Sequence, residues 1–303
     1  MTVPRLAAVV LNYRTPLDTL QAVQSLLASE RPIDEIVVVD NDRGEACWEA
    51  LAPVAGRVTR LSTGSNLGFS GGINAGLRMA LAHGAEALLI VNSDVVVSPE
   101  CVGSLDLALQ SRADAGVAGP IVVSRSDPTR ILSAGIRYDY LTGRMRHLAA
   151  GTPLDTLRSD DVDIVDGVSG CLMLIKRAVL ETAGLFDERF FYSFEDLDLC
   201  LRARRAGLST IVLRRSMALH EGGRSIGATS TRRLYYASRN HRLLVEQASG
   251  PSPALIAACR TSAVLLFNVL HAMTAPGGSL ADRLDAVMQG ARDYSNGRFG
   301  IER

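Results

Sequence analysis

The feature that most constrains the fold of this chain is the alternation of short apolar runs with amphipathic stretches in its first 120 residues. The apolar runs at 6–11, 36–39 and 88–91 are only four to six residues long and rich in β-branched side chains, which is typical of buried strands. Between them, Thr15-Pro16 and Ser98-Pro99-Glu100 predict helix N-termini with capping side chains. Strands that alternate with helices predict βαβ units and a mainly parallel sheet.

The remaining chain predicts smaller strands followed by helices. A short helix around Trp48 and a strand near Val58 are expected, and the short runs at 116–175 predict an inserted hairpin region rather than a new domain. A helix at 195–205 and a strand at 210–213 follow. The last 70 residues predict mostly helices, interrupted at 251–253 and 276–278 by proline and glycine.

Composition excludes several classes of protein. The 32 basic and 32 acidic residues balance, so no overall field would recruit nucleic acid. Lys176 is the sole lysine, so nearly all of the basic residues are arginines. Either a GC-rich genome or a need for bidentate anion binding would explain this preference for arginine. The five cysteines are far apart and form no C-x-x-C pair, which argues against a zinc site and suits a reducing compartment.

The location expected from the sequence is cytoplasmic. The N-terminus runs straight into an apolar strand and lacks the pattern of a signal peptide. The apolar stretch at 262–273 is too short to span a bilayer, which needs roughly 20 residues. Peripheral contact with the inner face of the cell membrane stays open.

Polar clusters follow three of the expected strands: Asn12-Tyr13-Arg14, Asp40-Asn41-Asp42 and Asn92-Ser93-Asp94. Ligands of parallel sheets bind beyond the carboxyl ends of the strands, so three clusters at equivalent positions indicate a site. The Asp94 carboxylate is suited to a Mg²⁺ ion that bridges phosphates. The alternative is an Asx-type turn.

The start of the helix at 195–205 carries three carboxylates, Glu195, Asp196 and Asp198. The helix dipole favours anions there by about 0.3–1 kcal/mol, and Asp198 is spaced to pair with Arg202, so a structural role is open. The aromatic run Phe190-Phe191-Tyr192 just before them would raise a carboxylate's pKa and suit a general base. The residues of this segment alone are compatible with either a structural role or a general base.

Three further features bear on anion binding. His220 follows a strand and leads into Glu221-Gly222-Gly223-Arg224, which suggests an anion-binding loop, although a single histidine is more often structural. Ten arginines at 202–242 form either a solvated helical face or a site for a diphosphate or lipid-linked phosphate. The glycine-rich run at 64–72 predicts a loop that approaches a nucleotide closely, but it is neither a P-loop nor a dinucleotide fingerprint.

Taken in order, these motifs resemble those of family 2 glycosyltransferases, especially the bacterial rhamnosyltransferase-like branch. The similarity extends over about residues 5–245 and rests on Val-Leu-Asn-Tyr (10–13), Val-Val-Asp-Asn (38–41), Asn-Leu-Gly-Phe-Ser-Gly-Gly-Ile-Asn-Ala-Gly (66–76), Leu-Ile-Val-Asn-Ser-Asp (89–94), Val-Asp-Gly-Val-Ser-Gly-Cys-Leu-Met-Leu-Ile (165–175), Gly-Leu-Phe-Asp-Glu-Arg-Phe-Phe (184–191), Glu-Asp-Leu-Asp-Leu-Cys-Leu-Arg (195–202) and His220.

This resemblance implies an α/β fold of the GT-A (Rossmann-like) type, with a mixed, mainly parallel sheet flanked by helices. It implies a glycosyltransferase domain over 1–230, with a nucleotide-sugar-binding half at 1–120 and an acceptor-binding, catalytic half at 121–230. The helices at 231–303 form a C-terminal extension. The implied reaction is an inverting transfer from a nucleoside-diphosphate sugar.

The resemblance also implies roles for individual residues. Asp40 would read the base, with Tyr13 and Asn66 nearby, and Asn92-Ser93-Asp94 matches the family's D-x-D motif with Asn in place of the first Asp. Asp94 and His220 would hold Mg²⁺ or Mn²⁺. The E-D motif matches Glu195 and Asp196, with Asp196 as the base. The other expected contacts to the nucleotide sugar are Asn12, Asn41, Gly71, Asn74, Asn92 and Gly170. The turn after Asn41 departs from the family pattern, since it continues into Asp42-Arg43 rather than Ser and Asp.

The alternatives are a nucleotidyltransferase of related fold and a non-catalytic nucleotide-sugar-binding module. The acceptor is expected to be a carbohydrate, a lipid-linked glycan or a small natural product. Leu234-Tyr235-Tyr236 with Arg239-Asn240 resembles a segment that leads into membrane-associated or acceptor-covering helices. The stretch at 254–275 predicts an interfacial helix, a helix packed on the domain, or a homodimer contact.

Overall fold

The computed structural model describes residues 4–157, 159, 161–222, 227, 229–249 and 254–302. Its strands are β1 (Leu6–Asn12), β2 (Glu35–Asp40), β3 (Thr59–Ser62), β4 (Ala87–Asn92), β5 (Val95–Val97), β6 (Ala115–Ser124), β7 (Ile131–Ser133), β8 (Ile136–Tyr138), β9 (Met145–His147), β10 (Val162–Val165), β11 (Leu172–Lys176) and β12 (Ser209–His220). Its α-helices are α1 (Pro16–Leu27), α2 (Ala46–Ala50), α3 (Gly68–Ala82), α4 (Cys101–Ser111), α5 (Arg177–Ala183), α6 (Glu195–Arg205), α7 (Thr231–Ser249), α8 (Ala254–Thr274) and α9 (Leu280–Ser295).

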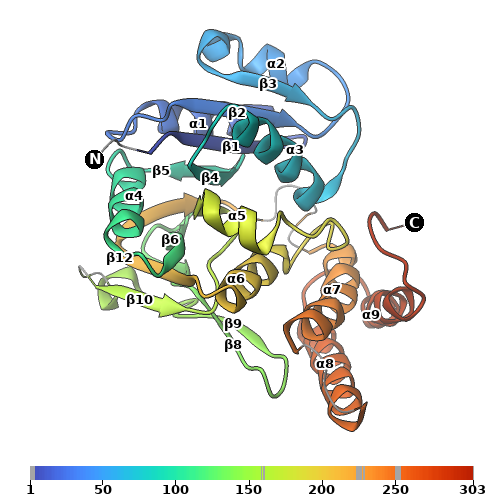
Figure 1. The fold of residues 1–303 in the computed structure, drawn as a ribbon. Coiled ribbons are helices and arrows are strands. Elements are labelled where there is room, and N and C mark those ends of the chain that lie inside the picture. Colours follow the sequence, from blue (N-terminus) through green and yellow to red (C-terminus); the bar gives the residue numbers. More distant parts are fainter. Residues whose placement is uncertain are drawn as a thin grey trace.

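One mixed sheet organises the molecule (Figure 1). Its main path runs β10-β12-β6-β11-β4-β1-β2-β3, with β5 beside β12 and β7 beside β6. The β3, β2, β1 and β4 strands are parallel to one another, and β11 pairs antiparallel with both β4 and β6. The expected mixed α/β architecture of the GT-A type is thus confirmed, with β8 and β9 forming a separate hairpin.

Two apolar cores lie on opposite faces of the sheet because successive strand residues point to opposite sides. On β1, Ala8 and Val10 join the core covered by α1, α2 and α4. Val9 and Leu11 join the core covered by α3, α5 and α6. Strands buried on both faces read as continuous apolar runs, and these are the runs visible in the sequence.

Several local expectations were wrong. The glycine-rich run is only partly a loop, since α3 begins at Gly68. Neither Thr15 nor Ser98 provides a side-chain cap: Thr15 instead bonds the Ser93 hydroxyl (Oγ1 to Oγ, 2.7 Å), and α4 has Glu100 at its N-cap. The strand expected at 210–213 extends to His220, because β6 and β5 continue to pair with it.

From Thr231 onward the regular elements of the described residues are all helices, α7, α8 and α9. These helices pack against one another beside the sheet (Figure 1). The break expected at 251–253 lies outside the described residues, whereas the break at 276–278 separates α8 from α9. Within the described ranges, none of the helices combines the length and apolar character needed to cross a membrane.

Candidate active site

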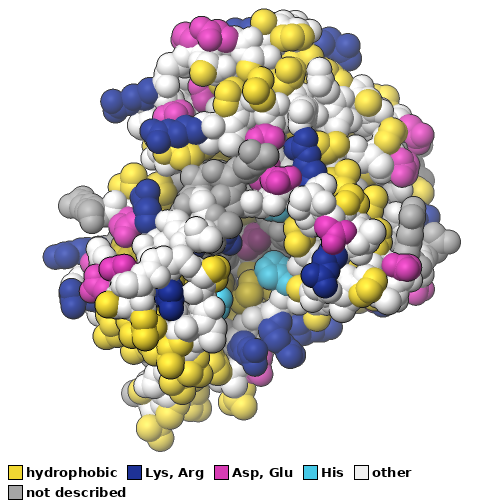
Figure 2. Space-filling view, turned by 180° about the vertical axis from the view of Figure 1, so that it is seen from behind, with side chains coloured by type: hydrophobic (Ala, Val, Ile, Leu, Met, Phe, Trp, Pro, Cys, Tyr) yellow, Lys and Arg dark blue, Asp and Glu magenta, His cyan; other side chains and the backbone are white. Residues whose placement is uncertain are grey.

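The polar clusters after β1, β2 and β4 lie at one edge of the sheet. In the parallel register Asn12 is opposite Asp40, and Leu11 is opposite Asn92. The carboxyl ends of these strands therefore meet, as the sequence predicted. Figure 2 shows that one face of the molecule is hollowed, with acidic and histidine side chains inside the hollow.

Asp40 is buried at the bottom of this edge. Its Oδ1 accepts a hydrogen bond from Asn12 Nδ2 (2.7 Å), and both residues are at most 3% exposed. Burial raises the pKa of Asp40, the Asn12 hydrogen bond opposes this, and the charges of Asp42 and Glu45 add to it. Tyr13 lies beside them at intermediate exposure, with the Arg14 guanidinium 5.1 Å from its ring centroid.

Asn41 and Asn66 shape the loop between β3 and α3. The Asn41 carboxamide accepts from Leu67 N (3.0 Å) and donates to Gly68 O (2.9 Å). Asn66 Oδ1 accepts from Gly68 N (2.8 Å) and from Asn41 Nδ2 (3.2 Å). The polar atoms of Asn41 are thus engaged with the loop, so its effect on a ligand would be through the loop's shape.

The glycines of α3 allow close packing. Gly68 has a φ of +74°, and a Cβ there would collide with the Phe191 carbonyl oxygen, which accepts from Phe69 N at 2.6 Å. A Cβ at Gly71 would lie 2.7 Å from Leu67 Cβ. Gly68 therefore lets the start of α3 pack against the 190–194 segment, whereas Gly71 makes room for the Leu67 side chain. Both glycines serve packing, a role that differs from a phosphate cradle.

Asp94 and His220 face each other across β5 and β12. His220 pairs with Val95 in the antiparallel register, and its Nε2 lies 3.2 Å from Asp94 Oδ1. Gly222 N donates to Asp94 Oδ2 (3.1 Å). Burial alone would raise the pKa of Asp94, but the hydrogen bond and charge of His220, with the Gly222 amide, lower it overall. The loop residues Gly223 and Arg224 lie outside the described residues.

Asp196 is held by backbone amides at the start of α6. Its Oδ2 accepts from Gly170 N (2.8 Å) and its Oδ1 from Leu197 N (2.7 Å). A Cβ at Gly170 would lie 3.1 Å from Asp196 Cβ, so glycine leaves the carboxylate room. Asp196 stays partly exposed while Glu195 beside it is 7% exposed.

Glu195 is buried without a hydrogen-bond partner for Oε2 among the described residues. Burial first, and then the charges of Asp196 and Asp198, raise its pKa well above the usual range. The side chain therefore favours the neutral acid. By contrast Asp198, also buried, pairs with Arg202 Nε at 2.8 Å, as the i,i+4 spacing predicted.

The segment at 170–171 joins the two halves of the site. Asn92 N, at the end of β4, donates to the Cys171 carbonyl (2.9 Å), and Gly170 N donates to Asp196. Burial raises the pKa of the Cys171 thiol to about 12, and the charges of both Asp94 and Asp196 add to the rise. Burial also raises the pKa of Tyr192, with the charge of Arg233 opposing and those of Glu195 and Asp94 adding to it.

The segment before α6 is strained and is held by α7. Phe191, Ser193 and Phe194 all have φ between +60° and +74°. Asn240 Nδ2 donates to the carbonyls of Phe190 (2.7 Å), Tyr192 (2.6 Å) and Ser193 (3.1 Å). Such backbone persists only where surrounding groups over-determine it, and strained segments cluster at functional sites.

Arg239 completes this clamp without a carboxylate partner among the described residues. It is fully buried, and its guanidinium donates to the carbonyls of Phe190 (3.0 Å), Arg189 (3.2 Å) and Gly300 (2.7 Å). It also donates to Asn240 Oδ1 (2.9 Å). Rings of Tyr235, Tyr236 and Phe299 lie within 6 Å of it, so cation–π contacts offset part of its lost hydration.

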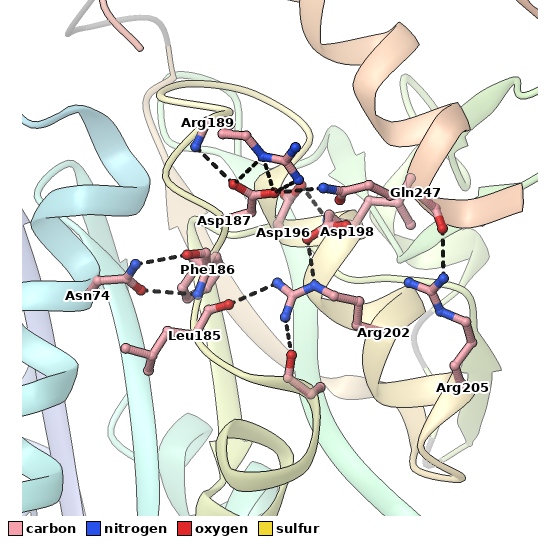
Figure 3. A network of polar contacts seen from close by, with 12 residues as sticks. Asn74, Leu185, Phe186, Asp187, Arg189, Asp196, Asp198, Arg202, Arg205 and Gln247 are labelled. Atoms are coloured by element: carbon pink, nitrogen blue, oxygen red, sulfur yellow. Dashed lines mark hydrogen bonds and ion pairs between the residues drawn. The ribbon is translucent and has the colours of Figure 1, made fainter. Parts of the chain in front are cut away.

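A polar network ties α3 and α6 to the 185–189 segment (Figure 3). Asn74 exchanges two hydrogen bonds with the Phe186 backbone, at 2.8 and 3.0 Å. Arg202 donates to Leu185 O (2.9 Å), and Gln247 donates to Asp187 Oδ2 (2.7 Å). Asn74, expected at the nucleotide sugar, is thereby placed between α3 and this segment.

The donor set at Asp94 fits a divalent cation completed by phosphate oxygens. Mg²⁺ is usually held by one or two protein carboxylates plus substrate phosphates. Asp94 and His220 would supply one carboxylate and one imidazole nitrogen, and in this structure the two side chains bond each other at 3.2 Å. In the described parts of the chain no group of three or more His, Cys, Asp or Glu side chains would form a complete protein cage.

The sequence does not reveal the residues that hold the segment before Asp196. Arg239 and Asn240, which bond its carbonyls, enter the sequence analysis only as part of a similar segment. An arginine followed by asparagine in an otherwise ordinary helix carries no signal of burial. Only the adjacent tyrosines, which supply rings for a buried cation, gave a hint.

Comparisons with known proteins identify the family of the chain. A family model described as "Glycosyltransferase like family 2" matches residues 4–239. The dTDP-rhamnosyl transferase RfbF of Shigella flexneri is 25% identical over 272 residues, 87% of this chain and 86% of that protein. The N-acetylglucosaminyl-diphospho-decaprenol L-rhamnosyltransferase of Mycobacterium tuberculosis is 27% identical over 66% of this chain and 70% of its own.

Solved structures show the same fold. The mannosyltransferase PcManGT of Pyrobaculum calidifontis, in complex with GDP-Man and Mn²⁺, superposes with a TM-score of 0.61 at 14% identity, over 96% of this chain and 87% of that one. Residues 1–349 of TarS from S. aureus give a TM-score of 0.55 at 15% identity, over 97% and 92%. The family match covers every strand of the sheet and extends from before β1 into α7, and the chain belongs to glycosyltransferase-like family 2.

Proposed function

We propose that this glycosyltransferase is inverting and metal-dependent, and that it moves a sugar, rhamnose or another deoxysugar, from a nucleoside-diphosphate donor to an acceptor hydroxyl. The observation that carries the proposal is the partly exposed Asp196 carboxylate, fixed by Gly170 N and Leu197 N, in a segment whose Cys171 carbonyl accepts from Asn92 N at the end of β4. The rhamnosyltransferase names of two relatives support the choice of sugar.

The donor would lie along the carboxyl edge of the sheet. Asp40, held by Asn12, would accept hydrogen bonds from the base, with Tyr13 and Asn66 beside it and Asn92 next to the sugar. Gly71 and Asn74 act through the packing of α3, as Asn41 acts through its loop. The chain would divide into a nucleotide-sugar-binding half at 1–120, an acceptor-binding, catalytic half at 121–230 and a helical extension at 231–303. Arg239 and Asn240 of that extension would support the catalytic half.

Asp94 and His220 are the residues that would hold Mg²⁺ or Mn²⁺. When bound, such a cation supplies positive charge against the charge that develops on the leaving diphosphate. Asp196 accepts the proton of the acceptor hydroxyl through a carboxylate that two backbone amides orient, one on each oxygen. Such proton transfer typically contributes 10²–10⁴-fold. Attack from the face opposite the leaving group inverts the anomeric carbon in one step.

Glu195 has a supporting role in this account. Its raised pKa keeps it neutral beside Asp196, so that only one of two adjacent carboxyl groups carries charge in the buried site. An ionised Glu195 would repel the Asp196 carboxylate. We therefore assign it to maintaining the electrostatics of the base rather than to proton transfer.

A panel of nucleotide sugars tests the proposal. We expect nucleoside-diphosphate release from one donor, dependent on Mg²⁺ or Mn²⁺ and lost in both Asp94→Ala and Asp196→Asn. The matched control is Asp114→Asn, an exposed carboxylate beside Ser209 at the start of β12, the opposite end of that strand from His220. Metal-independent release, or full activity of Asp196→Asn, would contradict the proposed mechanism. Binding of a donor without turnover in any acceptor mixture would favour a binding module.

A further inference from the structure

The hairpin of β8 and β9 carries a hollow that the donor site does not use. Its volume is about 270 Å³, and its lining residues are Arg137, Asp139, Arg144 and Arg146. Arg137 and Arg146 lie directly opposite each other in the antiparallel register. Like charges at opposed positions destabilise a sheet pair, so this arrangement has an energetic cost unless an anion lies between them.

The arginines of the hollow are poorly neutralised by the protein. The Arg146 side chain makes no hydrogen bond or ion pair with any residue in the described ranges, although its charge helps to lower the pKa of Asp139 after the amides of Thr142 and Leu141. The Arg144 guanidinium only approaches the Phe267 ring, at 5.9 Å. Arg137 lies 3.8 Å from Asp166, a carboxylate that also bonds Arg204. The Asp139 carboxylate is engaged by the amides of Leu141 and Thr142. The hollow therefore has an excess of positive charge.

This contrasts with several of the arginines between 202 and 242, which the sequence offered as candidates for phosphate binding. Arg202 and Arg214 pair with Asp198 and Asp163, and Arg239 is buried against backbone carbonyls. Their donors are committed to holding the fold. The available cations lie on the hairpin instead.

The hairpin packs against both α6 and α7. Ile136 and Tyr138 of β8 share an apolar core with Leu197 and Leu201 of α6. The exposed Arg137 between them points to the other face of the strand.

The hairpin turn also reaches the start of α6 through α7. The carbonyl of Gly143 accepts from His241 Nε2 of α7 (2.7 Å), and the His241 ring stacks on Phe194 with centroids 5.2 Å apart. Phe194 directly precedes Glu195 and Asp196. A ligand in the hollow is therefore held by a hairpin that packs on the helix carrying Asp196, on the face of the hairpin that is turned away from that helix.

An exposed apolar face of α8 borders the hairpin. Leu255, Leu266, Leu270 and Met273 are each more than half exposed and recur on one side of the helix. Arg260 of α8 donates to the carbonyl of Leu141, itself 75% exposed at the hairpin turn. Figure 2 shows hydrophobic side chains gathered at the lower left of that face, with Lys and Arg side chains beside them.

We propose that the hairpin hollow binds the phosphate group of a lipid-linked acceptor, with the hydrocarbon chain along the apolar face of α8. Arginine guanidinium groups bind phosphate oxygens in a bidentate manner, which suits the opposed Arg137 and Arg146. A second copy of the chain fits less well, since a two-fold contact through α8 would bring the same excess of arginines together. The identification of the ligand as the acceptor rests on the proposed function; the binding site itself does not.

Binding without turnover tests this proposal. Farnesyl diphosphate, inorganic pyrophosphate and farnesol are titrated into the full chain in metal-free buffer by calorimetry. We expect farnesyl diphosphate to bind most tightly and farnesol to bind least. The double variant Arg137→Gln/Arg146→Gln should weaken farnesyl diphosphate binding at least tenfold, whereas Arg57→Gln, an exposed arginine at the other edge of the sheet, should not change it.

A second pair of substitutions separates the lipid from the phosphate. Leu266→Ser/Leu270→Ser should weaken farnesyl diphosphate binding severalfold and leave pyrophosphate binding unchanged. Unchanged binding in the arginine double variant would refute the phosphate site, and equal affinities for pyrophosphate and farnesyl diphosphate would refute the lipid face. Displacement by nucleoside diphosphate would place the ligand in the donor site and also overturn the proposal. A dimer lost in the leucine variant would assign the face to a second copy. All of these measurements report binding and none needs turnover. The proposed binding site can therefore be refuted or supported whatever the role of Asp196.

Discussion

Removing the Asn240 carboxamide should loosen the segment that leads into the base. In Asn240→Ala, the Tyr192 and Ser193 carbonyls lose their donor, and Arg239 Nε loses its acceptor. The Phe190 carbonyl keeps a bond from Arg239. Of these three groups only Arg239 Nε is in a fully buried hydrogen bond, because water can reach the partly buried Tyr192 and Ser193 carbonyls. A buried polar group left unpaired costs about 1–3 kcal/mol, so we expect the free energy of unfolding to fall by about that amount.

The same substitution should lower the rate of transfer more than the affinity for the donor. Phe191, Ser193 and Phe194 hold positive φ values that the clamp maintains, and the backbone relaxes when it is removed. A shift of about 1 Å in a catalytic group can cost about 10²-fold in rate. Asp40, Asp94 and the loop at 63–68 have no direct contact with Asn240, so donor binding should stay within about twofold.

Urea unfolding and steady-state kinetics check both parts. The control is Asn296→Ala, an exposed asparagine at the C-terminus of α9, whose unfolding free energy should change by less than about 0.5 kcal/mol. Asn240→Asp keeps the shape of the side chain but replaces the NH₂ donor by an oxygen that cannot donate to the backbone carbonyls. It should therefore be as damaging as alanine. An Asn240→Ala loss below about 1 kcal/mol, with kcat unchanged, would refute the reasoning.

Three further predictions concern single contacts. The pKa of Glu195 is raised above its usual 4.5, so the native state keeps a proton that the unfolded chain releases, and the free energy of unfolding should fall by about 1.4 kcal/mol per pH unit above about 4.5. Glu195→Gln should remove this slope in urea unfolding measured at several pH values. Identical slopes in the two proteins would show that the pKa of Glu195 is not raised. Gly68→Ala should destabilise the protein by about 1–3 kcal/mol more than Gly44→Ala, since both have positive φ but only Gly68 faces the Phe191 carbonyl; equal thermal shifts would contradict this. His220→Ala should weaken the stimulation of donor binding by Mn²⁺ at least tenfold in calorimetry, with metal-free binding unchanged, and an unaltered metal response would remove His220 from the site.

The sheet was readable from the sequence because its strands are buried on both faces. Continuous apolar runs at 6–11, 36–39 and 88–91 coincide with β1, β2 and β4, and the polar residues after them meet because parallel strands end at one edge. The helix at 195–205 also matches α6 residue for residue. These are local patterns whose physical cause lies within the segment itself.

What the sequence did not reveal depends on contacts between distant segments. The Thr15 hydroxyl was expected to cap α1, but it bonds Ser93, 78 residues away. Gly68 begins a helix rather than continuing a loop because the carbonyls and amides of Asn41, Asn66 and Phe191 hold it there. Arg239 could not be distinguished from solvated arginines, since its burial requires three aromatic rings and carbonyls from two other segments.

The central claim is that Asp196 is the base of an inverting transfer, and Asp196→Asn tests it most directly. Asparagine can still accept from Gly170 N or Leu197 N, so the fold and the affinity for the nucleotide sugar should persist. With the donor identified, turnover should fall by about 10²–10⁴-fold while the donor Kd measured by calorimetry stays within about twofold. Full turnover in Asp196→Asn, or a product that retains the anomeric configuration of the donor by NMR, would contradict the account.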